Sequence, residues 1–179
     1  MQKLIKLNYG CGEMKLEGFI NIDIEKKVKP DLVCDLRKEK LPYKTNSVET
    51  IYCIHNIEHI EYRYWPHVFY EFNRVLRMGG ELVLMYPEFE VCVKYFLSNY
   101  KGLRDFWQAT LYGRQAYLGD YHVTPVRSAF LSDNLSKSGF KNIKYRPEKP
   151  EEFNSILSCV KGTVLTREDV IRKEVFKIA

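Results

Sequence analysis

The sequence predicts a single α/β domain, residues 1–179, built around a mostly parallel sheet. Short apolar runs rich in Ile, Val and Leu alternate with turn residues through the first half of the chain. One segment of helical period lies between the fourth and the fifth of these runs, which is the order of a strand–helix–strand crossover. The runs are apolar on both faces, as in strands that helices cover on both sides.

Five strands are expected in the first half of the chain. They span Lys3–Asn8, Phe19–Ile24, Leu32–Leu36, Val48–Ile54 and Glu81–Tyr86. Between the last two strands, apolar residues recur at helical spacing over Tyr62–Met78. Gly79 and Gly80 are expected to end that helix, because glycine is common just after a helix C-terminus.

The second half of the chain is less regular. Residues 88–123 predict helical pieces, with a break near Lys101-Gly102, and then a loop. Thr124 is expected to cap the next helix, with Pro125 at its first position. A capping box over Thr166–Asp169 predicts a final helix. The helix that follows Thr124 is expected to end near Ser138. Two strands are expected after it, near residues 141–147 and 154–161.

Composition argues against several classes of protein. The net charge of +5 is too diffuse to indicate nucleic-acid binding. Five cysteines without a Cys-x-x-Cys pair indicate neither a disulfide framework nor a zinc site. The sequence has no apolar signal core and no run of membrane-spanning length, so it predicts a protein of the reducing cytoplasm.

Glycine and polar residues fall at the ends of the first three strands, where sheets of this kind bind ligands. Gly10 and Gly12 lack side chains and would let a nucleoside cofactor approach the backbone. Asp23, after the second strand, can accept two hydrogen bonds from a ribose diol. Asp35, after the third strand, can reach the exocyclic amine of an adenine. Taken singly, each is equally a tight turn or a capping carboxylate, but three at consecutive strand ends favour a cofactor site.

These residues resemble the motifs of class I S-adenosylmethionine-dependent methyltransferases, and most closely those of the small predicted methyltransferases of bacteria and phages. The matching segments are Leu7–Gly12, Asn21–Asp23, Cys34–Leu36, Leu41–Tyr43, Asn46–Ile51, His55–Ile60 and Glu71–Leu82. The resemblance covers roughly residues 4–90 in order and 111–140 more loosely. It implies a Rossmann-like three-layer sandwich with a mostly parallel seven-stranded sheet, whose last strand runs antiparallel between the fifth and the sixth.

The resemblance also implies that S-adenosylmethionine is the cofactor. The residues implied to bind it are Asn8, Tyr9, Gly10, Cys11, Gly12, Asp23, Ile24, Asp35, Leu36, His55 and Asn56. This chain departs from the family at Asn8, where Asp or Glu is usual, and at Met14, where a third glycine is usual. Asp23 follows Gly12 by only eleven positions, whereas a crossover usually needs ~10–12 residues besides its strand. The first helix is therefore expected to be shortened or absent.

Two histidines follow the fourth strand, where the resemblance places the methyl group. A histidine can remove a proton near neutral pH, which makes His59 a candidate catalytic residue. The favoured alternative is that His59 hydrogen-bonds its own loop while His55 contacts the cofactor through its backbone. The pair His55-x-x-x-His59 lacks a third ligand, so no metal site is predicted.

Residues 88–123 are expected to cover the methyl group and to form the acceptor pocket. They start at the ligand end of the sheet and carry more aromatic residues than a plain crossover helix needs. Tyr112 and His122 are the further candidate catalytic residues. His122 is the better candidate for the base, because Asp120 could orient its ring.

The predicted function is methyl transfer from S-adenosylmethionine to a small-molecule or glycan-type acceptor. DNA-base methylation is disfavoured, because the chain has neither an Asn/Asp-Pro-Pro-aromatic run after the fourth strand nor a Pro-Cys pair. A non-catalytic protein that binds the same cofactor for regulation is the alternative, supported by Asn8 and the short first connection. A nicotinamide dehydrogenase fits less well, since Gly12–Lys15 breaks its glycine pattern.

Overall fold

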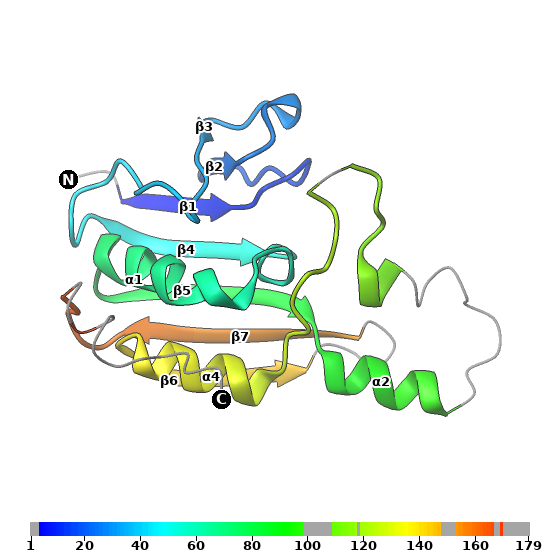
Figure 1. Cartoon of the computed structure of the whole chain (residues 1–179). Coiled ribbons are helices and arrows are strands. Elements are labelled where there is room, and N and C mark those ends of the chain that lie inside the picture. The colour runs from blue at the N-terminus through cyan, green and yellow to red at the C-terminus, as the bar shows by residue number, and fades with distance from the viewer. Residues whose placement is uncertain (1–3, 99–108, 118, 148–152, 167–168, 170–179) are drawn as a thin grey trace.

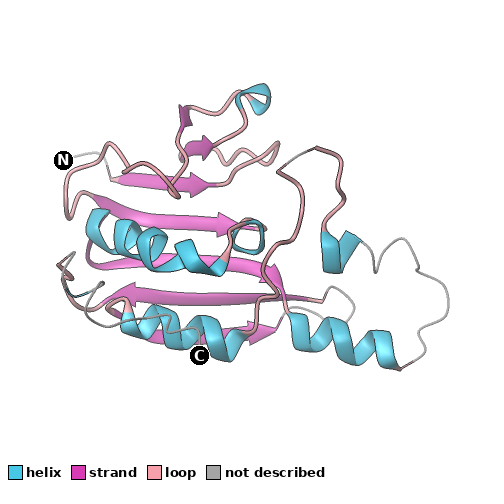
Figure 2. Cartoon of the chain, viewed as in Figure 1, coloured by secondary structure: helices cyan, strands magenta, loops and turns pink. Residues whose placement is uncertain are grey.

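The computed structural model describes residues 4–98, 109–117, 119–147, 153–166 and 169. At its centre lies a seven-stranded sheet in the order β3-β2-β1-β4-β5-β7-β6 (Figures 1 and 2). The strands are β1 (Ile5–Tyr9), β2 (Ile20–Asp23), β3 (Leu32–Val33), β4 (Val48–Ile54), β5 (Leu76–Pro87), β6 (Phe140–Pro147) and β7 (Asn154–Lys161).

The first five strands are parallel, and β7 is antiparallel to both of its neighbours, β5 and β6. In the register of the β5–β7 pair, Leu84 lies opposite Leu157, and both side chains are fully buried. The position and direction of β7 confirm the predicted Rossmann-like sheet.

Helices α1 (Trp65–Val75) and α4 (Ser128–Lys137) lie on the same face of the sheet, whereas α2 (Phe89–Leu97) projects from the end of β5 (Figure 1). Three short 3-10 turns are also described, η1 (Lys26–Val28), η2 (Ile57–His59) and η3 (Tyr62–Tyr64), together with a helical stretch at residues 109–112. No helix in the described ranges is long and apolar enough to cross a bilayer.

The buried face of α1 follows from the spacing of its apolar residues. Trp65, Phe69 and Phe72 recur every three or four positions and are fully buried against the sheet. The ring of Phe72 meets the ring of Tyr9 edge-on, with centroids 5.5 Å apart. This helix therefore packs behind the end of β1, where the glycine turn begins.

The helix predicted over Tyr62–Met78 is α1, and both of its predicted boundaries are wrong. A 3-10 turn precedes α1, and the chain leaves the helix at Leu76, whose ψ of 137° is extended. Leu76 is fully buried and pairs with Val48 of β4, so sheet pairing outweighs local helix propensity. Gly80 lies inside β5, where a Cβ would come within 2.9 Å of the Glu49 carbonyl oxygen.

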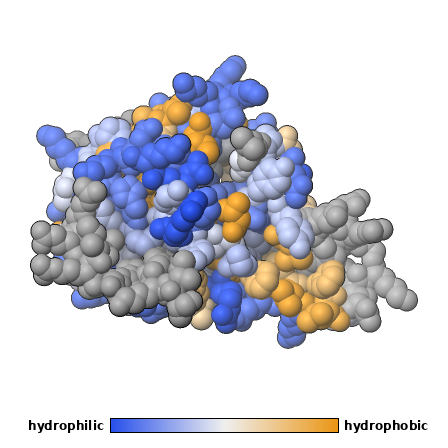
Figure 3. All heavy atoms as spheres, viewed as in Figure 1, coloured by the Kyte–Doolittle hydropathy of each residue, from blue (hydrophilic) through white to orange (hydrophobic). Residues whose placement is uncertain are grey.

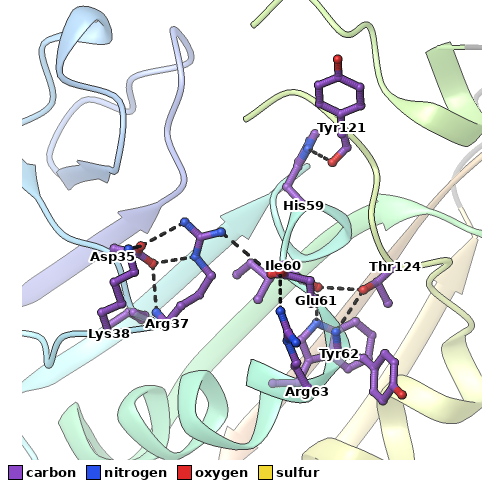
Figure 4. Close-up of polar contacts among 12 residues, drawn as sticks. Asp35, Arg37, Lys38, His59, Ile60, Glu61, Tyr62, Arg63, Tyr121 and Thr124 are labelled. Atoms are coloured by element: carbon purple, nitrogen blue, oxygen red, sulfur yellow. Dashed lines mark hydrogen bonds and ion pairs between the residues drawn. The ribbon is translucent and has the colours of Figure 1, made fainter. Parts of the chain in front are cut away.

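Thr124 does not cap a helix, contrary to the prediction. Helix α4 begins at Ser128. The Thr124 hydroxyl instead donates to the Ile60 carbonyl over 2.8 Å and accepts from the Tyr62 amide over 3.1 Å (Figure 4). The Thr124 hydroxyl, which was expected to cap a helix, is therefore bonded to residues 60 and 62, about sixty positions earlier in the sequence.

The reciprocal bonds of the predicted capping box are present. The Thr166 amide donates to the Asp169 carboxylate over 2.8 Å, and the Asp169 amide donates to the Thr166 hydroxyl over 3.2 Å. The helix predicted after this box and the predicted break near Lys101-Gly102 lie outside the described residues.

A buried ion pair fixes the connection between β3 and β4. Glu71 on α1 has a fully buried side chain and accepts from the Arg74 guanidinium over 2.8 Å and from the Leu41 amide over 3.2 Å. Arg74 also donates to the carbonyls of Leu41 and Tyr43, over 2.9 and 2.8 Å. The pair thus holds residues 41–43 against α1.

Candidate active site at the carboxyl ends of the strands

The glycine turn after β1 is folded onto β2. The amides of Gly10 and Cys11 both donate to the Ile22 carbonyl, over 2.8 and 3.0 Å. Gly10 has a φ of +71°, and a Cβ added to it would lie 2.1 Å from Cγ of Asn56. Glycine is needed at this position because the loop after β4 leaves no room for a side chain. Two predicted cofactor segments, 10–12 and 55–56, therefore lie in contact.

Asp23 at the end of β2 holds this turn in place. One carboxylate oxygen accepts from the Gly12 amide over 2.7 Å, and the other accepts from the Glu25 amide over 2.8 Å. Each oxygen keeps a second lone pair for a ligand hydroxyl. The next residue, Ile24, is exposed at the same strand end.

The connection between β1 and β2 has no helix over residues 10–19, all of which are described, as its length predicts. Polar side chains hold it instead. The Asn8 amide group donates to the Met14 carbonyl over 2.9 Å and to the Asn21 side-chain oxygen over 3.0 Å. The Asn21 amide donates to Asp31 over 2.7 Å, and these hydrogen bonds from Asn21 lower the pKa of Asp31. Sequence reasoning missed both Asn21 and Asp31.

Asp35 is engaged by a neighbouring arginine rather than free. Arg37 donates to its two carboxylate oxygens over 2.8 and 3.0 Å and lies 3.9 Å from Glu61 (Figure 4). Burial alone would raise the pKa of Asp35, but the hydrogen bonds from Arg37 leave it lowered. An adenine at this strand end would thus meet an Asp35–Arg37 pair, and Arg37 was not predicted from the sequence.

Three predicted cofactor residues have side chains that are buried behind the site. The Tyr9 hydroxyl accepts from the Leu36 amide over 3.2 Å, and both side chains belong to the core. Burial raises the pKa of Tyr9. Cys11 is buried within the turn, and burial raises the pKa of its thiol to about 11. These side chains shape the site from behind, and their backbones lie at the strand ends.

The loop after β4 begins with an unusual backbone conformation. His55 has a φ of +48°, and its amide donates to the Met85 carbonyl over 2.8 Å. Non-glycine residues in this region store strain, often of about 1–3 kcal/mol, and cluster at functional sites. Nδ1 of His55 lies 3.5 Å from a carboxylate oxygen of Glu58, a side chain only 1% exposed. Neither oxygen of Glu58 has a hydrogen-bond partner among the described residues.

His59 and His122 lie together although 63 positions separate them. Their ring centroids are 4.8 Å apart, in an edge-to-face arrangement. Nδ1 of His59 lies 3.0 Å from the Tyr121 carbonyl oxygen (Figure 4), and Nδ1 of His122 lies 2.9 Å from the Thr110 carbonyl oxygen. A carbonyl oxygen only accepts, so both Nδ1 atoms carry protons, and Nε2 of each neutral ring holds a lone pair. Burial lowers the pKa of His122, which favours the neutral ring.

The end of the acceptor segment, at Val123, and the following Thr124 are anchored to the loop after β4. The amides of Val123 and Thr124 both donate to the Glu58 carbonyl, over 2.9 and 3.1 Å. In Figure 1 this part of the chain passes along the carboxyl ends of the central strands. His122 is therefore positioned at the strand ends by its own backbone neighbours.

One expectation about the acceptor segment is wrong. Asp120 does not orient His122, because its carboxylate accepts from the Ala116 amide over 3.1 Å and lies 3.7 Å from Arg114. At Gly113 the chain crosses itself closely, since a Cβ there would lie 1.8 Å from the Asp120 carbonyl oxygen. The Tyr112 side chain is exposed, and its carbonyl accepts from the His122 amide over 3.1 Å.

Helix α2, which is the start of the acceptor segment, packs near Leu111. Leu111 contacts a small buried cluster that contains Cys92 of α2 and Phe153. Phe96 and Leu97 at the end of α2 are exposed, and hydrophobic side chains gather over this helix in Figure 3. A separate hollow of about 480 Å³ lies over β5, β6 and β7, and its lining contains none of the predicted site residues.

Residues 17–84 match a family model described as a methyltransferase domain. No curated protein matches the chain in sequence. A SAM-dependent methyltransferase from Methanosarcina mazei is similar in structure, with a TM-score of 0.63 and 16% identity over 90% of this chain and 94% of that chain. A SAM-dependent methyltransferase of Thermotoga maritima, described as a possible histamine N-methyltransferase, has a TM-score of 0.60 and 15% sequence identity. The match covers 90% of this chain and 83% of that chain.

A third similar structure is phosphoethanolamine N-methyltransferase 2 of Haemonchus contortus in complex with S-adenosyl-L-methionine. It gives a TM-score of 0.58 and 12% identity over 91% of this chain, which spans only 50% of that chain. At these identities the likeness concerns the fold. The matched methyltransferase domain and the shared fold together support the predicted class, an S-adenosylmethionine-dependent methyltransferase of class I.

Proposed function

We propose that the chain transfers a methyl group from S-adenosylmethionine to a small-molecule or glycan-type acceptor. The observation that carries this proposal is the contact between His122 and His59, which joins the acceptor segment to the loop after β4. In this proposal residues 88–123 cover the acceptor. The five described cysteines are all free and buried, which fits the proposed cytoplasmic location.

In this proposal the cofactor lies at the carboxyl ends of β1, β2 and β4. The backbone of residues 10–12 approaches it, the Asp23 carboxylate accepts from its ribose, and the Asp35–Arg37 pair borders its adenine. His55 and Asn56 close the site from β4. We also propose kinship with the small methyltransferases of bacteria and phages, as the sequence resemblance implies.

His122 is the proposed proton acceptor. Its Nε2 carries a lone pair beside His59, and burial lowers the pKa of the ring, which favours its neutral form. We assign His59 to a second contact with the acceptor, and the exposed Tyr112 hydroxyl to the outer wall of the same space.

A non-catalytic, regulatory protein that binds the same cofactor is the second candidate. It is favoured by Asn8, whose amide group is occupied by Met14 and Asn21 and which brings no charge to the sulfonium. Transfer of a radiolabelled methyl group from S-adenosylmethionine to a component of cell extract would support the enzyme. Cofactor binding without any such transfer would support the regulatory protein.

Binding of S-adenosylhomocysteine should raise the melting temperature of the protein. At a hundred times its dissociation constant, a ligand adds about 2.7 kcal/mol to the free energy of unfolding. Each kcal/mol raises the melting temperature of a domain of this size by about 2–4 °C, so a rise of roughly 5–10 °C is expected. Differential scanning fluorimetry measures it, with NAD as the control ligand. No shift at millimolar S-adenosylhomocysteine would remove the basis of both candidate functions.

His122→Ala should abolish methyl transfer and leave the affinity for S-adenosylhomocysteine within a few-fold of the wild type. The reason is that His122 faces the acceptor side rather than the glycine turn. Radiolabel transfer and calorimetry measure the two effects. His67→Ala is the matched control, because His67 lies on α1 with Nε2 3.4 Å from the Glu39 carbonyl oxygen, outside the site. Full activity of His122→Ala would exclude the assigned role.

A further inference from the structure

The Glu58 side chain lacks the partners that a buried carboxylate needs. It is 1% exposed, and neither carboxylate oxygen has a hydrogen-bond partner among the residues that the structure describes. Nδ1 of His55 is 3.5 Å from one oxygen and pairs with it only when that ring is protonated. A buried charge without partners is costly, and such a group is normally paired or coordinates a metal. The position therefore calls for a positively charged partner.

The two histidines beside Glu58 present lone pairs rather than protons. Because Nδ1 of His59 and Nδ1 of His122 donate to backbone carbonyls, Nε2 of each neutral ring is an acceptor. A backbone carbonyl on the second ring nitrogen is also the usual outer partner of a metal-bound histidine, because it fixes the tautomer and the ring orientation. Three acceptors thus lie together, and within the described ranges the Glu58 oxygens have no hydrogen-bond donor.

We propose that Glu58, His59 and His122 bind a divalent transition-metal ion. One ligand atom from each residue lies within 4.8 Å of the other two. Donors around one zinc ion lie about 3.3 Å apart, given bonds of about 2.0–2.1 Å, so binding draws the three side chains inward by rotation. One carboxylate with two imidazoles suits zinc, manganese, iron or cobalt rather than magnesium or calcium. The ligand set differs from the His55–His59 pair considered in the sequence, because Glu58 and His122 join His59 and His55 is not a ligand.

Three protein ligands leave coordination positions open, as in catalytic metal sites. We place the acceptor at these open positions, because His122 ties the acceptor segment to the ion. An acceptor with a hydroxyl or carboxylate oxygen would bind the ion there and be oriented toward the methyl group. This last step rests on the proposed function, whereas metal binding itself does not. With the ion bound, Nε2 of His122 is a ligand and no longer the proton acceptor, because one lone pair cannot bind both an ion and a proton.

The test is metal binding by chelator-stripped protein, measured calorimetrically with Mn²⁺, Co²⁺, Zn²⁺ and Mg²⁺ alone. One site per chain is expected for the first three ions, and weaker binding for Mg²⁺. The visible spectrum of the Co²⁺ form should show nitrogen and oxygen ligation without a thiolate charge-transfer band, which excludes the five cysteines as ligands. Glu58→Gln and His122→Ala should each weaken Co²⁺ binding by more than ~100-fold. His67→Ala should bind as the wild type does.

Melting temperatures separate this site from a merely structural one. Glu58→Gln keeps the side chain's size and removes a buried, unpartnered charge, so the metal-free variant should melt at or above the wild-type temperature. Co²⁺ should raise the melting temperature of the wild type and not that of the variant. A fall in the metal-free melting temperature of Glu58→Gln would instead show that the carboxylate is a structural group, and would overturn the proposal.

Absence of metal binding by the wild type, or unchanged binding by Glu58→Gln and His122→Ala, would also overturn it. S-adenosylhomocysteine binding is measured on the same samples. If this ligand binds and metals do not, only the metal site is wrong. If metals bind at Glu58 and S-adenosylhomocysteine does not, the proposed function is wrong and the metal site stands.

Discussion

Gly10→Ala should abolish measurable binding of S-adenosylhomocysteine. The new Cβ would lie 2.1 Å from Cγ and 2.5 Å from Cβ of Asn56, so the loop after β4 must move away from the glycine turn. That movement separates the two segments proposed to hold the cofactor. The variant also places a side chain at a φ of +71°, which costs about 1–2 kcal/mol. Calorimetric titration measures the loss.

Gly18→Ala is the matched control for this effect. Gly18 has a φ of +78° and lies in the same connection, but a Cβ there meets no atom within 4 Å. Both variants bear the same backbone strain, and only Gly10→Ala has the clash. Asn56→Gly in the Gly10→Ala background should restore part of the binding. Equal affinities of the Gly10 and Gly18 variants would show that contact between the two loops does not matter.

Glu71→Gln should lower the melting temperature by about 6–20 °C. Removing one partner of a buried ion pair costs about 3–5 kcal/mol, and each kcal/mol is worth about 2–4 °C for a domain of this size. The variant leaves Arg74 with a weaker partner, although Arg74 still donates to Leu41 and Tyr43. Scanning calorimetry without ligand measures the change.

Glu49→Gln is the control for the loss of charge alone. Glu49 accepts from Arg77 over 3.0 Å, but this pair is solvent-exposed, with Arg77 48% exposed. Exposed pairs contribute about 0–1 kcal/mol, so a shift of only a few degrees is expected. If Glu71→Gln shifts no further than Glu49→Gln, the Glu71 pair does not anchor the connection.

Much of the sheet follows from hydrophobic periodicity. β4 and β7 are short apolar runs with clear boundaries, and the direction of β7 came from the family resemblance. The errors arose where a distant contact outweighed a local signal. Leu76 pairs with Val48 before the Gly79-Gly80 stop signal is reached, and the Thr124 hydroxyl binds Ile60 instead of a helix terminus.

The candidate site was predicted in part, for a similar reason. Gly10 and Asp23 were predicted because each lies at the end of a strand, where sheets of this kind bind ligands. Glu58 and Arg37 were missed, because the importance of each depends on burial or on a partner that sequence spacing does not reveal. The signal available for Glu58 was a charged residue between two apolar positions, Ile57 and Ile60, both of which are buried.

The place of β7 in the sheet constrains how the chain folds during synthesis. β7 is the last of the described strands to be made, yet it separates β5 from β6, through pairs such as Glu81–Val160 and Lys141–Val160. Until residues 154–161 emerge from the ribosome, the amide and carbonyl groups along one edge of β5 have no partner strand. Such open edges attract other chains, and strand pairs this far apart in sequence form slowly. A nascent chain halted before β7 would therefore be a substrate for chaperones, even though five strands of its sheet are already complete.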